Sequence, residues 1–335
     1  MKVLRFSYTE LPDLPPLACA IGYFDGFHHG HRQLVEKARQ LAQKHGISSA
    51  VMTFDPDPWY VFKPDADKHH LQSVHDKVVL CQNLGIDYLL IVDFTKEFAS
   101  LEPAAFHNVL AGLNIRYLVC GFDFTYGFRS TGNVETLKKQ DKFEVDVIEP
   151  IKHEDEKISS SRIEKLVREG RVEEANDLLD CYYSIAGIIV HGFERGRLLN
   201  YPTANLQPEA GYVLPKKGVY AGYVYENGEL HGCMINIGTN PTFENESMTI
   251  EAHIFNYSND LYGRTVRFFF AFRLRDEKRF SSVQELKEQL DHDAVESQKV
   301  LADNTRLLAP TVDLWKIMTP FDILNRKNSG ENYAK

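Results

Sequence analysis

The first half of the chain alternates short apolar runs with stretches of helical periodicity. The apolar runs predict strands at Leu17–Gly22, Ser49–Phe54, Tyr88–Phe94, Tyr117–Gly121 and Val145–Glu149. Apolar positions three and four apart predict helices at His31–His45, Lys77–Leu84, Pro103–Leu113, Ser161–Glu169 and Val172–Leu179. Strands that alternate with helices in this way are typical of a parallel sheet covered on both faces. We therefore expect an α/β domain with a doubly wound parallel sheet.

The pattern changes after Tyr182. Strands are predicted at Tyr183–His191, Val219–Glu226, Leu230–Ile237, Thr249–Phe255 and Thr265–Leu274, separated by Gly, Asn and Pro turns. Strands without intervening helices predict a mainly antiparallel sheet or β-barrel, here followed by one helix at Val283–Leu301. The expected domains are therefore residues 1–181 and 182–308. Residues 309–335 form an extension with no assigned role, which we expect to pack loosely and then to fray.

Length and composition agree with two globular domains. The chain has 335 residues, of which 43% are hydrophobic and 25% charged, so a disordered or collagen-like protein is excluded. The formal net charge of -9 argues against a general binder of nucleic acids or anionic membranes, although it allows a local cationic pocket. No apolar run approaches the roughly 18 residues that a membrane-spanning helix needs. No feature of the sequence indicates an oligomeric state.

The N-terminus and the cysteines indicate a reducing, cytoplasmic environment. Glu10 and Asp13 occupy the region where a signal peptide would need an apolar core. The five cysteines are far apart, odd in number and form no CxxC pair. We therefore expect buried thiols rather than a disulfide framework or a zinc knuckle.

The sharpest motif is GYFDGFHHGHRQL (residues 22–34), between the first predicted strand and the first predicted helix. Gly22, Gly26 and Gly30 allow the backbone to approach a ligand closely. His28 and His31 are three residues apart and would share one face of the helix at its N-terminus, where free N–H groups and the helix dipole favour phosphate. Two imidazoles at this position could stabilise the charge that builds up on a phosphoryl group during substitution.

Two alternatives compete with this interpretation. A histidine in a loop is often only a surface residue, and HHGH could coordinate zinc. The strand–glycine turn–helix context has no nearby cysteine and fits phosphate binding better, so we favour nucleotide chemistry over a metal site.

Two further motifs in the first half have a physical interpretation. ISSSRI (residues 158–163) opens a helix, where Ser159 and Ser160 are candidate caps that could bind the outer phosphates of ATP and Arg162 adds a planar cation. The alternative is a capped helix with an exposed arginine. GFDFTYG (residues 121–127) follows a strand, at the edge where doubly wound sheets bind ligands.

The second half carries HGFERGRLLNYPTANL (residues 191–206). Its glycines allow a loop to fold over a ligand, and Pro202 fixes the turn that follows. Thr203 and Asn205 would lie on one face of an extended segment. Both are hard oxygen donors that suit Mg²⁺ carrying ATP phosphates. A short turn without a ligand is the alternative.

The motifs of the first half, together with TFDPDP (residues 53–58), resemble the adenylyltransferase module of bacterial bifunctional riboflavin kinase/FAD synthetases. The resemblance implies that Asp123 and Phe124 contact the flavin and that ATP is bound by Gly22, Phe24, Asp25, Gly26, His28, His31, Ser159, Ser160 and Arg162. His28 and His31 would be catalytic. Asp55 and Trp59 are further pocket candidates. Asp57 stands where the family usually has histidine, which weakens any role for that position.

The second half resembles the riboflavin kinase of the same family. The similarity extends through GVYAG (residues 218–222), NIGTNPTF (residues 236–243) and IEAHIFNYSNDLYG (residues 250–263). It implies that Glu251 is the general base at the ribityl hydroxyl and that MgATP is bound by Gly192, Gly196, Arg197, Thr203 and Asn205. Thr203 and Asn205 would hold the metal. Asn200 replaces a glycine that the family often has.

The expected function follows from both resemblances. Riboflavin and MgATP would give FMN in the barrel, and transfer of AMP from ATP to FMN would then give FAD and pyrophosphate in the α/β domain. Three alternatives remain open at this point: only one half is active, the protein is a flavin-binding sensor without turnover, or the adenylyl acceptor is different.

Overall fold

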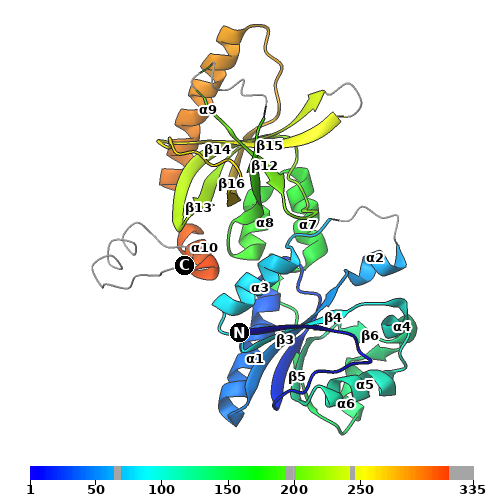
Figure 1. Ribbon diagram of the computed structural model, residues 1–335. Coiled ribbons are helices and arrows are strands. Elements are labelled where there is room, and N and C mark those ends of the chain that lie inside the picture. Colours follow the sequence, from blue (N-terminus) through cyan, green and yellow to red (C-terminus); the bar gives the residue numbers. More distant parts are fainter. Residues whose placement is uncertain (64–68, 193–198, 200, 242–245, 317–335) are drawn as a thin grey trace. The chain divides into compact units, whose positions relative to one another are not determined.

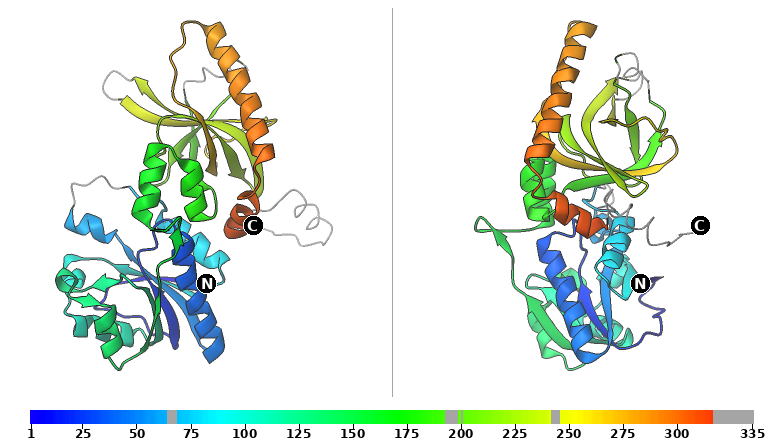
Figure 2. Two further views of the ribbon diagram at one scale, coloured as in Figure 1. Left: turned by 180° about the vertical axis from the view of Figure 1, so that it is seen from behind. Right: turned by 90° about the vertical axis from the view of Figure 1, so that its left-hand side faces the viewer.

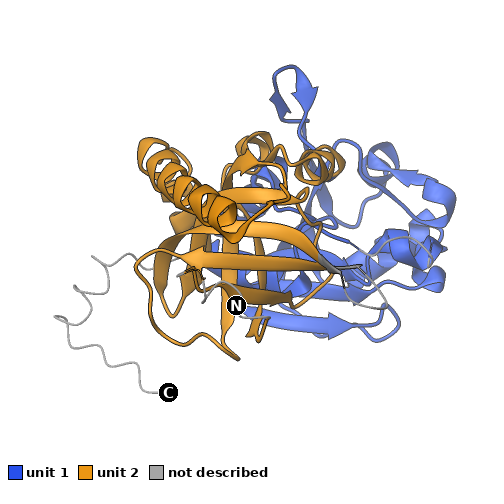
Figure 3. Ribbon diagram, turned by 90° about the horizontal axis from the view of Figure 1, so that it is seen from above, with its two compact units in different colours: residues 1–160 blue, residues 161–335 orange. Residues whose placement is uncertain are grey.

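The structure is a computed structural model that describes residues 1–63, 69–192, 199, 201–241 and 246–316. The chain divides into two compact units, residues 1–160 and residues 161–335 (Figure 3).

The first unit is built on a parallel sheet of six strands in the order β1-β4-β3-β2-β5-β8 (Figure 1). The strands of this sheet are β1 (Lys2–Phe6), β2 (Leu17–Ile21), β3 (Ser48–Asp55), β4 (Tyr88–Asp93), β5 (Ile115–Gly121) and β8 (Glu144–Ile148). The helices are α1 (His29–His45), α2 (Pro58–Phe62), α3 (Val74–Asn83), α4 (Lys96–Ala99), α5 (Pro103–Gly112) and α6 (Val134–Lys139). Two small hairpins complete the unit, β6 (Thr125–Tyr126) with β7 (Gly132–Asn133) and β9 (Lys152–His153) with β10 (Glu156–Lys157).

The burial of strand β2 explains why helices cover both faces of this sheet. All five residues of β2 are buried. Leu17, Cys19 and Ile21 belong to the core cluster that also contains apolar residues of α5 and α6. Helix α1 packs against β2, β3 and β5 with Leu34, Val35, Ala38 and Leu41 buried. Since successive residues of a strand point to opposite faces, a strand that is buried throughout needs a cover on each side.

The second unit is a closed barrel with the strand order β11-β12-β15-β14-β13-β16, and every pairing is antiparallel. Its strands are β11 (Tyr183–Val190), β12 (Ala204–Pro208), β13 (Gly218–Glu226), β14 (Glu229–Pro241), β15 (Glu246–Ile254) and β16 (Thr265–Arg275). Its helices are α7 (Ser160–Glu169), α8 (Val172–Leu179), α9 (Val283–Asp303) and α10 (Leu308–Trp315). Helix α9 runs along the outside of the barrel (Figure 2) and packs on β13, β14 and β16.

The fold class predicted from the sequence is confirmed: a parallel α/β unit precedes an antiparallel barrel with a long C-terminal helix. The contacts within the chain place α7, from Ser161 onward, and α8 in the second unit, and the boundary at residue 182 stays a prediction. All five cysteines are free and buried, as the cysteine pattern predicts. Among the described residues, none of the helices is both long and apolar enough to cross a membrane.

The expectation of loose packing is wrong for the start of the C-terminal extension. Helix α10 forms there, and its Trp315 is only 7% exposed. The Trp315 ring packs against Phe269 and under the guanidinium of Arg267, 3.9 Å from the ring centroid. Tyr182 N–H also donates to the Thr311 hydroxyl at 2.9 Å, which fixes the helix on the base of the barrel. Residues 317–335 lie outside the described residues.

Candidate active sites

The turn between β2 and α1 lies at the topological switch point of the sheet. Strand β2 lies between β3 and β5: the chain continues from β2 to β3 and β4 on one side and then crosses back to β5 on the other side. Doubly wound sheets bind ligands outside the carboxyl ends of the strands at this point. The turn has three residues with left-handed backbone, Phe24 (φ 56°), Gly26 (φ 83°) and Phe27 (φ 43°). Two aromatic residues with positive φ are costly, and such strain clusters at functional sites.

The two histidines of the turn form one unit at the start of α1. His28 is the N-cap, and its Nδ1 accepts the backbone N–H of His31 at 3.3 Å. The two rings stack with their centroids 3.7 Å apart and an angle of 16° between the planes. In nearly parallel rings the in-plane lone pairs do not converge on one point, as a shared metal ion would require. The spacing predicted that both rings share the helix start, and the structure places them there.

Burial makes both imidazoles neutral at physiological pH. His28 is 5% exposed, and burial lowers its pKa to about 4, assisted by the positive charges of Lys157 and Arg32. Burial and the neighbouring His28 hold the pKa of His31 well below its usual range. The Nδ1 atom of His31 is buried without a hydrogen-bond partner. A buried polar atom without a partner is rare in proteins, and this one lies at a helix start that favours phosphate.

Asp25 supports the turn from within. Its carboxylate accepts the N–H groups of Leu71, at 2.9 Å, and Gln72, at 3.1 Å. Its carbonyl oxygen accepts the Ser160 hydroxyl at 2.7 Å. Burial raises the pKa of Asp25 to about 6, and the nearby charge of Lys77 opposes this shift. Phe24, another residue expected at ATP, has a fully buried ring that packs on His31, so only its backbone is available to a ligand.

The TFDPDP segment has structural partners. Asp57, which replaces the family's histidine, is the N-cap of α2 and accepts the N–H of Trp59 at 2.7 Å. Asp55 forms an ion pair with Arg5 of strand β1 at 2.7 Å. Trp59 is 55% exposed and stacks with the Lys63 ammonium, so of these pocket candidates it offers the most open surface.

The two expected flavin contacts lie together just after β5. Asp123 is exposed and forms an ion pair with Lys157 of the β9–β10 hairpin. The Lys157 ammonium also lies 4.7 Å from the ring centroid of Phe122, which is 39% exposed. Phe124 is half-buried and stacks on Tyr126, next to the core. The segment therefore presents an aromatic surface beside a fixed cation.

The ISSSRI motif spans the start of α7. Ser159 precedes the helix, and the Ser160 hydroxyl donates to the Asp25 carbonyl of the turn between β2 and α1. Arg162 follows in the first helical turn, within the second unit, and is half-buried.

In the barrel, three strands bring polar side chains to one row. Asn205 of β12 and Asn236 of β14 both lie opposite Glu251 of β15. Ile250 and Ala252 are buried, so Glu251 points to the other face of its strand. The hydroxyl of Thr203, just before β12, donates to the Glu251 carboxylate at 3.1 Å. The structure thus brings Thr203, Asn205 and Glu251 together, although they come from motifs 48 residues apart.

Thr203 also lines two hollows. The first, of about 310 Å³, has mixed walls that include Glu251, Asn236 and apolar residues of β13, β14 and α9. The second, of about 520 Å³, is lined by Pro202, Ala204 and the segment from Tyr257 to Tyr262. Thr203 therefore borders both hollows while its hydroxyl is bonded to a carboxylate, and a group transfer depends on residues that position two bound molecules next to each other.

The glycine-rich loop of the barrel is described only in part. A side chain at Gly192 would place its Cβ 2.4 Å from the Asn205 amide, so the backbone there must pass close over Asn205. Gly196, Arg197 and the departure at Asn200 lie outside the described residues.

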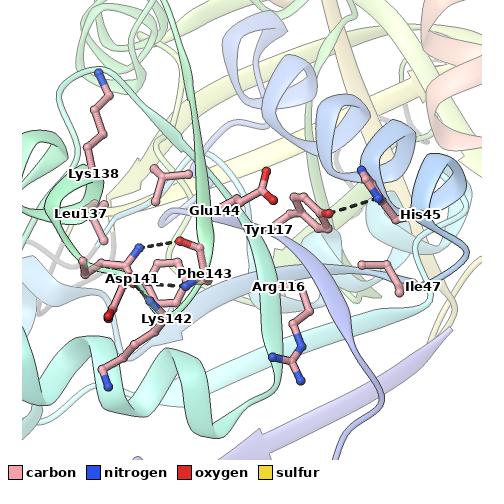
Figure 4. Close-up of a pocket in the computed structure, with 12 residues that line it drawn as sticks. His45, Ile47, Arg116, Tyr117, Leu137, Lys138, Asp141, Lys142, Phe143 and Glu144 are labelled. Atoms are coloured by element: carbon pink, nitrogen blue, oxygen red, sulfur yellow. Dashed lines mark hydrogen bonds between the residues drawn. The ribbon is translucent and has the colours of Figure 1, made fainter.

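A larger hollow, of about 810 Å³, lies at the opposite edge of the parallel sheet (Figure 4). It is lined by the first residues of β5 and β8 and by His45, which stacks on Tyr117 and hydrogen bonds to its hydroxyl at 3.1 Å. The amino ends of parallel strands are not the ligand-binding edge. This hollow also contains none of the residues expected from the sequence motifs.

Sequence reasoning missed Lys77 of α3 and Asn236 of β14. Lys77 is 1% exposed although it lies in a helical sequence with no unusual motif. Its burial depends on tertiary packing, which no local pattern encodes. Asn236 belongs to the NIGTNPTF segment, and its alternation with the buried Ile235 and Ile237 was a usable signal.

Comparison with known proteins agrees with both sites. The model of the FAD synthetase family matches residues 11–162, and that of the riboflavin kinase family matches residues 179–301. A bifunctional riboflavin kinase/FMN adenylyltransferase of Bacillus subtilis is 38% identical over 83% of this chain and 90% of its own length. The protein of the same name from Escherichia coli is 32% identical over 89% of this chain and 97% of its own length.

A solved structure from Streptococcus pneumoniae, described as a macrolide-efflux protein, superposes with a TM-score of 0.82. It is 32% identical to this chain, and the match covers 88% of this chain and 98% of that protein. Its name refers to efflux, whereas both family models and the similar proteins above are named for flavin enzymes. Both family models match, and the Bacillus subtilis protein is 38% identical over most of the chain. The chain therefore belongs to the family of bifunctional riboflavin kinase/FMN adenylyltransferases.

Proposed function

We propose that the protein carries its two activities at two separate sites, one in each unit, and that the residues described above perform them. As a riboflavin kinase it transfers the γ-phosphoryl group of ATP to riboflavin and gives FMN and ADP. As an FMN adenylyltransferase it transfers AMP from a second ATP to FMN and gives FAD and pyrophosphate. Riboflavin, FMN and ATP are its small-molecule partners, and a cytoplasmic location, supported by five free buried thiols, is part of the proposal.

Adenylyl transfer is assigned to the turn between β2 and α1. The α-phosphate of ATP would lie on the backbone N–H groups at the start of α1, with Gly22 and Gly26 allowing close approach. An oxygen of the FMN phosphate attacks this phosphorus, and the bond to the β-phosphate oxygen breaks to release pyrophosphate. His28 and His31 donate hydrogen bonds to the charge that develops. One preorganised donor of this kind contributes about 100- to 1,000-fold in rate.

The groups around this turn are assigned to the rest of the two substrates. Asp123 and Phe124 would hold FMN, supported by the aromatic surface that Phe122 and Phe124 form beside Lys157. Ser159, Ser160 and Arg162 would bind the outer phosphates of ATP. The hydrogen bonds of Asp25 and Ser160 favour a supporting role for both, in addition to any direct contact with ATP.

Riboflavin phosphorylation is assigned to Thr203 and Glu251. The hollow beside α9, whose mixed walls include apolar residues of β13, β14 and α9, suits the flavin ring, and the second hollow suits ATP. Glu251 orients the ribityl hydroxyl and accepts its proton as the oxygen attacks the γ-phosphorus, while ADP leaves. The observation that carries this assignment is Thr203, which lines both hollows and is bonded to Glu251.

Mg²⁺ is part of the kinase proposal. Thr203 and Asn205 offer hydroxyl and amide oxygens, the hard donors that this ion accepts when ATP phosphates and water complete its shell. Bound there, the ion would neutralise part of the charge on the phosphates. Gly192, Gly196 and Arg197 would cover the nucleotide, and the close approach of Gly192 to Asn205 supports this for the first of them.

Paired variants test both assignments in one experiment. His28→Ala and His31→Ala should each lower FAD formation from supplied FMN by about 100-fold or more while FMN formation from riboflavin persists. Glu251→Gln should lower FMN formation by about 100- to 10,000-fold and leave FAD formation intact. The flavins are separated by chromatography after incubation with ATP and Mg²⁺. His29→Ala is the matched control, since His29 lies beside the stacked pair.

Three outcomes would contradict the assignments. Loss of both activities in one variant would mean unfolding or a shared site. Unchanged FAD formation in both histidine variants would remove the turn from catalysis. Tight flavin binding by the unaltered protein without pyrophosphate release would favour the sensor alternative.

A further inference from the structure

Lys77 of α3 is buried beneath the adenylyltransferase turn. It is 1% exposed, and its ammonium donates to the Tyr23 carbonyl at 2.7 Å and lies 3.7 Å from the centroid of the Tyr23 ring. The hydroxyl of Thr53, from β3, donates to the same carbonyl at 2.9 Å. Burying an ammonium group is costly unless charges and hydrogen bonds compensate it. A lysine kept in such a place therefore needs an explanation beyond packing.

The charges around Lys77 come from two segments of the site. Burial lowers the pKa of Lys77 to about 8, and the attraction of Asp25, Asp57 and Asp55 opposes this shift, so the ammonium form prevails at neutral pH. Asp57 also accepts a hydrogen bond from the Tyr23 hydroxyl. Tyr23 is thus held at its carbonyl by Lys77 and Thr53 and at its hydroxyl by Asp57. This network gives the aspartate that replaces the family's histidine a place in the site.

The position of the Tyr23 carbonyl matters because the strained part of the turn begins at the next residue. Phe24, Gly26 and Phe27 have positive φ, and His28 follows directly. Such a backbone persists only where its surroundings fix it on several sides. Asp25 is fixed by Leu71 and Gln72, and Tyr23 by Thr53 and Lys77. Of the two side chains that donate to the Tyr23 carbonyl, Thr53 is neutral and Lys77 is the charged one.

We propose that Lys77 is a positioning residue for adenylyl transfer: by fixing the Tyr23 carbonyl it holds the turn in the one conformation in which His28, His31 and the first N–H groups of α1 face the same phosphate. This inference rests on the proposed function of the turn. Lys77 acts through the turn and needs no contact with substrate. A displacement of about 1 Å at a reacting group can cost about 100-fold in rate, which sets the size of the expected effect.

The test replaces Lys77 by methionine in the full-length protein. Lys77→Met keeps an unbranched apolar chain and removes the ammonium. FAD formation from supplied FMN should fall by about 100-fold, mostly in kcat, because the histidines act in the transition state. FMN formation from riboflavin should stay within about twofold, since the kinase site lies in the other unit. Lys44→Met, at an exposed position of α1, is the matched control and should change neither activity.

A double-variant comparison separates positioning from a merely structural role. If Lys77 acts through the histidine pair, Lys77→Met should lower the residual rate of His31→Ala by less than about threefold, because groups that act as one unit are non-additive. The same loss of about 100-fold in both backgrounds would overturn the proposal. So would a rate of Lys77→Met within about threefold of the unaltered protein.

A second variant carries the test if Lys77→Met fails to fold, as thermal unfolding would show. Thr53→Val removes the other donor to the Tyr23 carbonyl without changing charge, and it should lower FAD formation by about tenfold. An unchanged rate in Thr53→Val overturns the proposal. If His28→Ala and His31→Ala both leave FAD formation intact, the proposed function of the turn fails, whatever the effect of Lys77→Met.

Discussion

At the residue scale, both site histidines of the free enzyme are neutral. Each ring can donate one N–H, but neither carries a fixed positive charge. Both rings are removed from water and lie near Lys157 or Lys77, so protonating either would add a buried positive charge. A neutral imidazole still has one N–H to donate. An anion placed beside the rings supplies the missing counter-charge and favours the protonated form. The charge of the pair is therefore set by the ligand.

This argument predicts proton uptake when ATP binds. Free His28 has a pKa of about 4, so at about pH 6 it carries almost no proton. The triphosphate raises that pKa, and a proton must enter with the ligand whenever the pH lies between the two values. Calorimetric titration with ATP, in two buffers of different ionisation enthalpy and without FMN, measures this uptake. The unaltered protein should take up more protons than His28→Ala.

The comparison with His28→Ala cancels the ionisation of ATP itself and the binding of ATP at the kinase site. His29→Ala serves as the second control and should behave like the unaltered protein. Equal proton uptake in the unaltered protein and in His28→Ala would mean that His28 stays neutral when ATP binds, and would contradict a ligand-set charge.

At the element scale, Gly30 explains why a glycine separates the two histidines of the motif. Gly30 lies in the first turn of α1, and its φ is not positive, so backbone freedom is not the reason. A Cβ at this position would lie 3.2 Å from Cε1 and Nδ1 of His28. The ring would have to move by a few tenths of an ångström, away from its stacking position on His31. The glycine therefore makes room for the imidazole pair.

Gly30→Ala should consequently separate activity from stability. Alanine favours a helix over glycine by about 1 kcal/mol, so the thermal stability of the first unit should stay equal or rise. FAD formation should fall by about 10- to 100-fold because the histidine pair is displaced. Thermal unfolding and the chromatographic assay measure the two effects. Gln33→Ala, at an exposed position of the same helix, is the control, and a fully active Gly30→Ala would contradict this role of the glycine.

The same helix shows what the sequence can predict and where local patterns stop. Apolar spacing and Gly46 located α1, and the motif placed the histidines at its start. Strand β1 was missed because Phe6 is its one buried residue, which gives a short, weak signal, although the strand pairs with β4 along its whole length. Strand β12 was missed because it begins within the PTAN segment, which was interpreted as a turn. Lys77 was missed because its burial depends on residues far away in the sequence.

At the scale of the whole molecule, two catalytic units on one chain carry out consecutive reactions. The product of the barrel, FMN, is the acceptor of the α/β unit. The buried core cluster of the first unit runs from Phe6 to Phe143, and the residues assigned to the kinase belong to the second unit. Each proposed site is assembled from side chains of its own unit, with Arg162 as the exception. Domains with separate cores can work independently, so neither reaction should need the other site on the same chain to be active.

A mixture of two inactive variants tests this independence. His28→Ala chains should stop at FMN, and Glu251→Gln chains should accept only supplied FMN. Mixed with riboflavin, ATP and Mg²⁺, they should form FAD together, after a lag in which FMN accumulates in solution. The lag should shorten as the amount of His28→Ala chains is raised, since these chains supply the intermediate. If the mixture forms FMN but no FAD, and Glu251→Gln chains also fail to convert supplied FMN, the adenylyltransferase site depends on an intact kinase site on the same chain, which contradicts the independence.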